Sequence, residues 1–178
     1  YRIPEPVLPA TAEKEILSAK PTFWQLRYPD GKHNAETLLV HPVTRRVVII
    51  TKTEDGKCAA YAMPEGAGTG KPVLLEKIAS LELPTRHRLG KRPHDACMTT
   101  GGAFSPDGSR IVIASYSYLY EWRIPRGGTL EEALKKAPEV LTPPLLPQLE
   151  AVCYNSDSTG FWLTSERLPT ALWRMLRR

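Results

Sequence analysis

Two carboxylates and a carboxamide stand at matching places in the sequence, each just before a short apolar run. Asn34 and Glu36 precede the run at 37–40, and Glu150 precedes the run at 151–154. Carboxylate and amide oxygens are the ligands that calcium prefers, at about six to eight per ion. Two facing carboxylates can also divide general acid and general base work. Asn34, Glu36 and Glu150 are therefore candidate calcium ligands, and Glu36 and Glu150 are candidate catalytic residues.

A structural role for the same carboxylates is the favoured alternative. In it, Glu36 and Glu150 accept hydrogen bonds from backbone N–H groups and hold neighbouring sheets in register. His33 stands close in sequence and could serve as a base, although a surface position is the simpler interpretation. Asp30 and Asp107 each precede a glycine, which is typical of tight turns.

The elements that would position these residues are short strands joined by polar turns. The first group of predicted strands covers 37–40, 46–52, 58–63 and 73–83, with turns at 42–45 and 54–57. A second group covers 101–104, 110–115 and 117–124, and a third covers 150–154, 161–164 and 171–175. One short helix is predicted near 129–136, where Thr129 and Glu132 have capping-box spacing.

The three groups look like repeats of one plan. Alignment on their turns places Glu36, Thr100 and Glu150 at one position. A period of about 50 to 64 residues with a small meander in each repeat indicates a β-propeller. The predicted fold is all-β: a partial propeller of about three four-stranded antiparallel blades with one short helix. Because rings need about four to eight blades, three repeats predict a fragment, or a ring completed by another polypeptide or a second copy.

The sequence divides into four parts on this scheme. Residues 1–27 lead in from a preceding blade, 28–94 form the first blade with a basic loop, 95–147 form the second blade with the helical insertion, and 148–178 form a third, incomplete blade. Within the lead-in, prolines at positions 4, 6 and 9 exclude a central strand. Residues 1–3 could end an edge strand, 11–20 could form a helical turn, and 23–28 alternate like a half-buried strand.

Composition is that of a folded protein. Of 178 residues, 42% are hydrophobic and 24% are charged, which excludes a disordered or collagen-like chain. No apolar stretch is long enough for a transmembrane helix, and no signal peptide is recognisable in a chain that begins at Tyr1.

The cysteines Cys58, Cys97 and Cys153 have no zinc-site spacing. They are read as small, mostly buried apolar side chains, with one disulfide plus a free thiol as the alternative.

The formal net charge of +5 owes much to a basic run at 86–94. Such a run could meet phosphate, an acidic protein or a membrane surface. It contains no aromatic side chain on which a base could stack, so nucleic acid is not an expected partner. A solvated loop is the favoured interpretation.

Several motifs resemble those of a known family. They are YRIPEP at 1–6, YPDGKHNAE at 28–36, SPDG at 105–108 with YEW at 120–122, and LEAV at 149–152 with TSE at 164–166. Together they are similar to successive motifs of bacterial secreted or lipid-anchored six-bladed propellers of unassigned function. These are distantly similar to phytase-like, esterase-like and gluconolactonase-type propellers. The resemblance implies that the chain corresponds to the C-terminal half of such a protein, located in the periplasm or outside the cell.

Two functions follow as expectations. The first is a non-catalytic binding or structural module, whose open blade edges are covered by another polypeptide or by the missing half of the same protein. The second, implied by the resemblance, is a calcium-dependent phytase-like or esterase-like hydrolase, with Glu36 and Glu150 as ligands or acid/base groups and His33 assisting.

Overall fold

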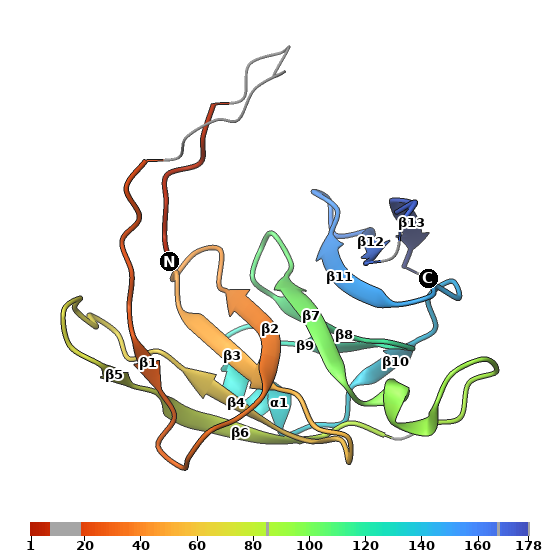
Figure 1. Cartoon of the computed structure of the whole chain (residues 1–178), viewed down its shortest axis with the longest axis horizontal. Helices are drawn as coiled ribbons and strands as arrows, with labels where there is room; N and C mark the ends of the chain where they lie inside the picture. Colours follow the sequence, from red (N-terminus) through yellow and green to blue (C-terminus); the bar gives the residue numbers. More distant parts are fainter. Residues whose placement is uncertain (8–18, 85, 167, 178) are drawn as a thin grey trace.

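The chain folds into a row of small antiparallel sheets, described here in a computed structural model for residues 1–7, 19–84, 86–166 and 168–177 (Figure 1). The first sheet contains β2 (Ala35–Val40), β3 (Val47–Thr51), β4 (Lys57–Ala62) and β6 (Glu76–Glu82). The second contains β7 (Thr99–Phe104), β8 (Arg110–Ser115), β9 (Leu119–Arg123) and β10 (Glu139–Leu141). The third contains β11 (Leu149–Tyr154), β12 (Gly160–Ser165) and β13 (Trp173–Leu176). The all-β, propeller-like architecture is confirmed, with one difference: the third sheet has three strands within the described residues rather than four.

The first strand of each sheet lies innermost, so that β7 is flanked by β2 and β11 (Figure 1). Each of these strands has a register shift against its partner at the same place. The shifts leave Glu36, Thr100 and Glu150 as the extra residues between paired neighbours. A β-bulge re-aims the side chain of its extra residue. The three positions aligned from the sequence are therefore equivalent in the backbone as well.

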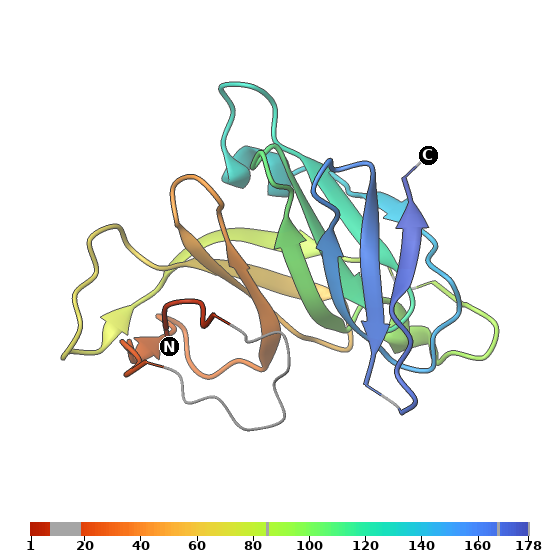
Figure 2. The ribbon, with the colours of Figure 1, turned by 90° about the horizontal axis from the view of Figure 1, so that it is seen from above.

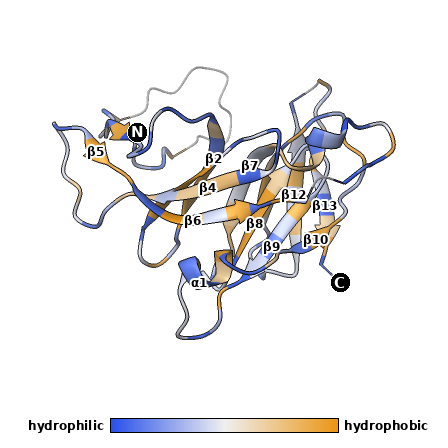
Figure 3. Cartoon of the chain, turned by 90° about the horizontal axis from the view of Figure 1, so that it is seen from below, coloured by the Kyte–Doolittle hydropathy of each residue, from blue (hydrophilic) through white to orange (hydrophobic). Residues whose placement is uncertain are grey.

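Two hydrophobic clusters join the sheets. One packs Leu39, Val48 and Ile50 of the first sheet against Ile113, Tyr120 and Trp122 of the second. The other packs Val112 and Leu119 of the second sheet against Val152, Phe161 and Leu163 of the third. Strand β8 supplies alternate residues to both clusters, and Figure 3 shows that it is largely hydrophobic. Strand β8 is therefore buried on both of its faces.

A buried carboxylate also links the second and third sheets. The Glu121 side chain is 1% exposed and accepts a hydrogen bond of 2.8 Å from the Tyr154 hydroxyl. Arg110 lies 3.4 Å from the same carboxylate. Arg177 lies 3.0 Å from it as an ion pair without hydrogen-bond geometry. Burial and the Glu121 charge both raise the pKa of Tyr154, so its hydroxyl stays protonated and remains a donor.

The lead-in departs from the sequence prediction. The half-buried strand expected at 23–28 is reduced to β1 (Leu26–Arg27), which pairs in parallel with β5 (Val73–Leu74). The strand predicted at 73–83 is accordingly divided into β5 and β6, because its first residues pair with the lead-in. Residues 1–3 contribute only a bridge from Arg2 to Thr22. The helical turn expected at 11–20 lies almost wholly outside the described residues.

The described residues include two short helical segments. Helix α1 (Leu130–Leu134) begins where the sequence predicts, with Thr129 and Glu132 forming the capping box. A 3-10 turn, η1 (Pro93–Ala96), begins within the last residues of the basic run and was not predicted. Neither these nor any other helix in the described ranges has the length and hydropathy needed to cross a membrane.

The basic run at 86–94 is not simply a solvated loop. The Arg88 guanidinium donates to the backbone carbonyls of Ser117 and Pro143, and the Lys91 ammonium donates to those of Leu146 and Pro147. Arg88 thus ties the connection between β10 and β11 to the second sheet, and Lys91 binds the same connection. The sequence could not indicate this, because the acceptors are backbone groups far along the chain.

The cysteines are free, and two of them match the expectation. Cys58 and Cys97 are buried, whereas Cys153 is exposed on the third sheet. The expectation of mostly buried thiols is thus met by Cys58 and Cys97 but not by Cys153.

Candidate functional site

Three carboxylates gather where the innermost strands begin. An open pocket of about 520 Å³ is lined by Glu36 of β2, Glu150 of β11 and Glu166, which follows β12. Tyr116 and Gln148 complete its polar wall. The two glutamates predicted from the sequence therefore do share one pocket, because each occupies the bulge of its strand. The sequence did not predict the other lining residues, Glu166, Gln148 and Tyr116. Its only indication of them was that each stands close to the end of a predicted strand.

A buried lysine neutralises one side of this pocket. The Lys52 side chain is 4% exposed, and its ammonium donates to Glu36 Oε2 at 2.5 Å and to the Tyr116 hydroxyl at 2.8 Å. The ammonium also lies 4.6 Å from the centre of the Tyr116 ring, within reach of a cation–π attraction. Burial alone would lower the pKa of Lys52, but the bonds to Glu36 and Tyr116 outweigh it and raise that pKa. Lys52 is therefore a fixed positive charge in the pocket.

The other side of the pocket carries two carboxylates and one amide. The Gln148 side-chain nitrogen donates to Glu150 Oε1 and to Glu166 Oε2, at 2.7 Å each. Burial raises the pKa of Glu150, and the nearby charges of Glu36 and Glu166 raise it further, while Gln148 and Lys52 oppose the shift. Glu150 thus holds a proton more readily than an ordinary glutamate does.

The candidate calcium ligands are only partly brought together. Asn34 is absent from the residues that line the pocket, and its backbone carbonyl accepts a hydrogen bond from the Lys52 N–H. Within the described parts of the chain, no three His, Cys, Asp or Glu side chains are grouped closely enough to hold a metal ion. The Lys52 ammonium already stands at the Glu36 oxygen that a cation would contact. Glu36 and Glu150 could still offer oxygens to a cation from opposite sides of the pocket, but Asn34 does not extend that set.

His33 belongs to a different cluster. Its Nε2 lies 2.9 Å from Asp30 Oδ1 and 3.1 Å from the Tyr61 hydroxyl. That hydroxyl donates to both oxygens of Asp30, at 2.9 and 2.7 Å. The Tyr61 bond, followed by the His33 bond, lowers the pKa of Asp30 to about 2. Asp30 therefore does more than shape a turn: it ties the loop at 28–33 to strand β4.

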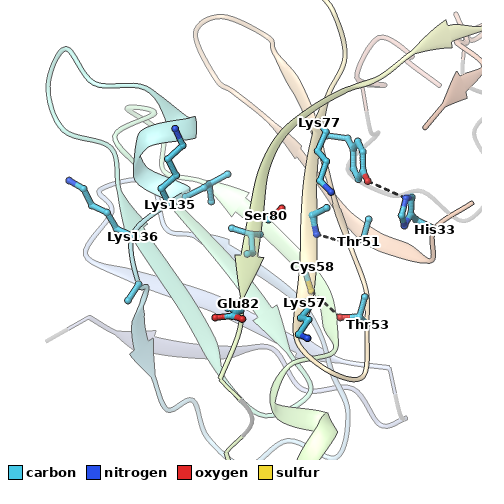
Figure 4. A pocket seen from close by; sticks show the side chains of 15 residues that line it. His33, Thr51, Thr53, Lys57, Cys58, Lys77, Ser80, Glu82, Lys135 and Lys136 are labelled. Carbon is cyan, nitrogen blue, oxygen red and sulfur yellow. Dashed lines mark hydrogen bonds between the residues drawn. The ribbon is translucent and has the colours of Figure 1, made fainter. Parts of the chain in front are cut away.

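The pocket beside His33 is separate from the one at Glu36 and Glu150. It has a volume of about 680 Å³, and its lining runs from His33 and Tyr61 past β6 to the end of α1. Figure 4 shows His33 and Lys77 on one side of β6, with Lys135 and Lys136 on the other. The predicted cooperation of His33 with the two glutamates has no support in this arrangement, because the pocket of Glu36 and Glu150 is lined without His33.

Three meander sheets in a row, with their first strands innermost, define the chain as a β-propeller fragment. The chain is similar to a solved structure described as the C-terminal WD40 domain of Sif2, with 19% sequence identity and a TM-score of 0.51. The match covers 85% of this chain and 37% of that one, so the chain spans little more than a third of the propeller that it matches. No protein-family model matches the sequence, and the search of curated proteins found no relative. The similarity shows a WD40-like propeller fold.

Proposed function

We propose that the chain is a non-catalytic binding or structural module, acting as one arc of a larger propeller or assembly. The observation that carries the proposal is that both end sheets present an uncovered face. On the first sheet, Leu38 and Val40 are 59% and 47% exposed. On the third, Cys153 is exposed and Trp162 is only half-buried. Exposed apolar side chains that lie together on one face of a sheet mark an interaction surface.

The fold supports the same proposal. WD40-like propellers commonly serve as binding modules, and a blade buries its faces only against its neighbours. The partner is another polypeptide or further blades of the same protein. Export by a bacterium, to the periplasm or beyond, and membership of a six-bladed secreted family rest on the sequence resemblance and form part of the proposal.

The intact mass of the protein from the cells that produce it tests the proposal. Denaturing and native measurements are made side by side. A denatured mass well above the 19.9 kDa of this chain, or a native mass above the denatured one, is expected. A stable protein of 19.9 kDa under both conditions would overturn the proposal, because its end sheets would then be self-sufficient.

A calcium-dependent hydrolase is the second candidate, and the convergence of Glu36 and Glu150 on one pocket favours it. It predicts that calcium at about 100 times its dissociation constant stabilises the protein by about 2.7 kcal/mol, and that Glu150→Gln abolishes this gain. Hydrolysis of p-nitrophenyl phosphate or p-nitrophenyl acetate should be lost in the same variant. The leading proposal expects no calcium-dependent shift in the unfolding temperature and no turnover of either ester.

A further inference from the structure

One face of the third sheet has exposed and half-buried side chains from all three of its strands. Residue pairing places Ala151 beside Thr164, and Cys153 beside Trp162 and then Arg174. These five residues, termed the outer face below, point away from Val152 and Leu163, which are buried against the second sheet. Ala151, Cys153 and Arg174 are exposed, and Trp162 and Thr164 are half-buried. Figure 2 shows β11, β12 and β13 at one end of the row of sheets.

The bulges allow the outer face to be compared residue by residue with the covered faces of the other sheets. Counting from the bulge, the row Cys153, Trp162 and Arg174 corresponds to Ala103, Val112 and Glu121 of the second sheet. In the first sheet, the same row is Leu39, Val48 and Ala62.

Both of those rows face the next sheet along the chain. Val48 lies in the cluster shared with the second sheet, and Val112 lies in the cluster shared with the third. A Cβ added at Gly102 of the second sheet would lie 3.0 Å from the Leu39 side chain. The outer face is therefore the surface on which this chain places a following sheet wherever a following sheet is present.

The third residue of the row determines which chemical group a docking partner must present to this face. Ala62 is apolar and has an apolar surrounding, whereas Glu121 is a buried charge that receives the Tyr154 hydroxyl. Arg174 takes the place of Glu121 with the opposite charge. A guanidinium covered by a sheet must have an acceptor, because a buried charge without a partner is strongly destabilising, and a carboxylate provides a paired acceptor in the matching geometry.

We infer that a propeller blade with an apolar face and one carboxylate docks on the outer face, the carboxylate meeting Arg174. The carboxylate belongs at the position equivalent to Tyr154, which faces Glu121 in the second interface. The inference rests on the proposed function, since it names the partner surface of that module. A second copy of this chain is a poor occupant, because its first sheet has the apolar Val40 at the equivalent position, where a carboxylate is required.

Photo-crosslinking in the cells that produce the protein, at its natural length, tests the inference. A benzophenone amino acid replaces Trp162 in one variant and, as a matched control off this face, the 85%-exposed Leu89 in another. The crosslinked peptides are sequenced by mass spectrometry. Capture at 162, but not at 89, of a strand that alternates apolar residues with one Asp or Glu is expected. A peptide from residues 35–51 of a second copy, an unrelated peptide or no capture at 162 would each overturn the inference.

Charge variants test the role of Arg174 in the same experiment. Arg174→Glu should lower the crosslinking yield at 162 at least tenfold, whereas Arg174→Lys should keep most of it, since losing a buried charged partner weakens association strongly. An equal yield in Arg174→Glu would overturn the carboxylate assignment. Because Arg174 is exposed in this chain, neither variant should disturb the fold of its three sheets, which circular dichroism of the 178-residue chain checks.

A third crosslinking position separates this inference from the proposed function. Leu38 lies on the uncovered face of the first sheet. Capture at 38 without capture at 162 would leave the module proposal standing and overturn only the docking of a blade on the outer face. Absence of capture at both positions, with a native and a denatured mass of 19.9 kDa, would overturn both.

Discussion

Removal of the Tyr154 hydroxyl should destabilise the protein through the contact between the second and third sheets. Tyr154→Phe deletes the 2.8 Å hydrogen bond to Glu121, whose side chain is 1% exposed. Hydrogen bonds to charged groups contribute about 1.5 to 3 kcal/mol to stability, and no water is expected to replace the lost donor in so closed a site. We expect a loss of about 2 kcal/mol, or about 4 to 8 °C in the unfolding temperature for a chain of this length.

Urea unfolding followed by tryptophan fluorescence measures this loss, and Tyr118→Phe provides the matched control. Tyr118 and Tyr154 are 8% and 7% exposed, but the Tyr118 hydroxyl donates to a neutral backbone carbonyl at 3.4 Å. Its removal should cost about 0.5 kcal/mol or less, because a long bond to a neutral acceptor contributes little. Equal losses in the two variants would refute the reasoning, since the Glu121 charge would then add nothing to the bond.

Three further predictions concern single side chains. Lys52→Met should raise the pKa of Glu150 further, because the Lys52 charge, like the Gln148 hydrogen bond, lowers that pKa. Carbon-detected NMR titration measures the change, and an unchanged pKa would contradict the prediction. Gly108→Ala should destabilise the protein by about 1 kcal/mol or more, since φ is +72° there and the new Cβ would lie 2.7 Å from the His41 ring. Gly70→Ala, with φ +89° and no neighbour within 4 Å, should cost clearly less in the same urea assay, and equal costs would exclude the His41 contact as the cause. Finally, the Asp30 pKa of about 2 is below its unfolded value of 3.8, so Asp30 stabilises the fold above about pH 4 and that contribution is lost as the pH falls towards 2. In a plot of the urea midpoint against pH, Asp30→Asn should make the slope between about pH 4 and pH 2 shallower. A slope identical to that of the unsubstituted protein would contradict the prediction.

The sequence was sufficient to predict the elements that repeat, because a pattern that recurs in three segments is stronger evidence for an element than a pattern that occurs once. Turns rich in Asp, Gly and Ser marked the connections between neighbouring strands of a sheet. The alignment of Glu36 with Thr100 and Glu150 identified three equivalent positions, although it did not indicate the bulge that they share. The capping box at Thr129 placed the start of α1. The turns and the capping box depend on residues close together in the chain, and the alignment compares such local patterns between repeats.

Contacts between distant segments were not predictable in the same way. Asp30 resembled a turn residue because its partner Tyr61 is 31 residues away, and no spacing rule connects them. Arg88 resembled a solvated charge because its acceptors are carbonyl groups, which every residue has and which leave no trace in the sequence. Gln148 holds two of the pocket's carboxylates, yet glutamine has no motif that would have distinguished it.

At the bulge position, the backbone determines where a polar group stands, and the side chain determines which contacts that group makes. At all three bulges the backbone is the same, but the Thr100 hydroxyl donates across to the Leu149 carbonyl of the third sheet at 2.8 Å. A threonine is short enough to be satisfied by the neighbouring backbone, and it therefore links two sheets. Glutamate at the same place reaches past the backbone, so Glu36 and Glu150 accept hydrogen bonds from the Lys52 and Gln148 side chains. The repeat thus fixes where a polar group stands, and the length and charge of that group decide whether it joins sheets or lines the pocket.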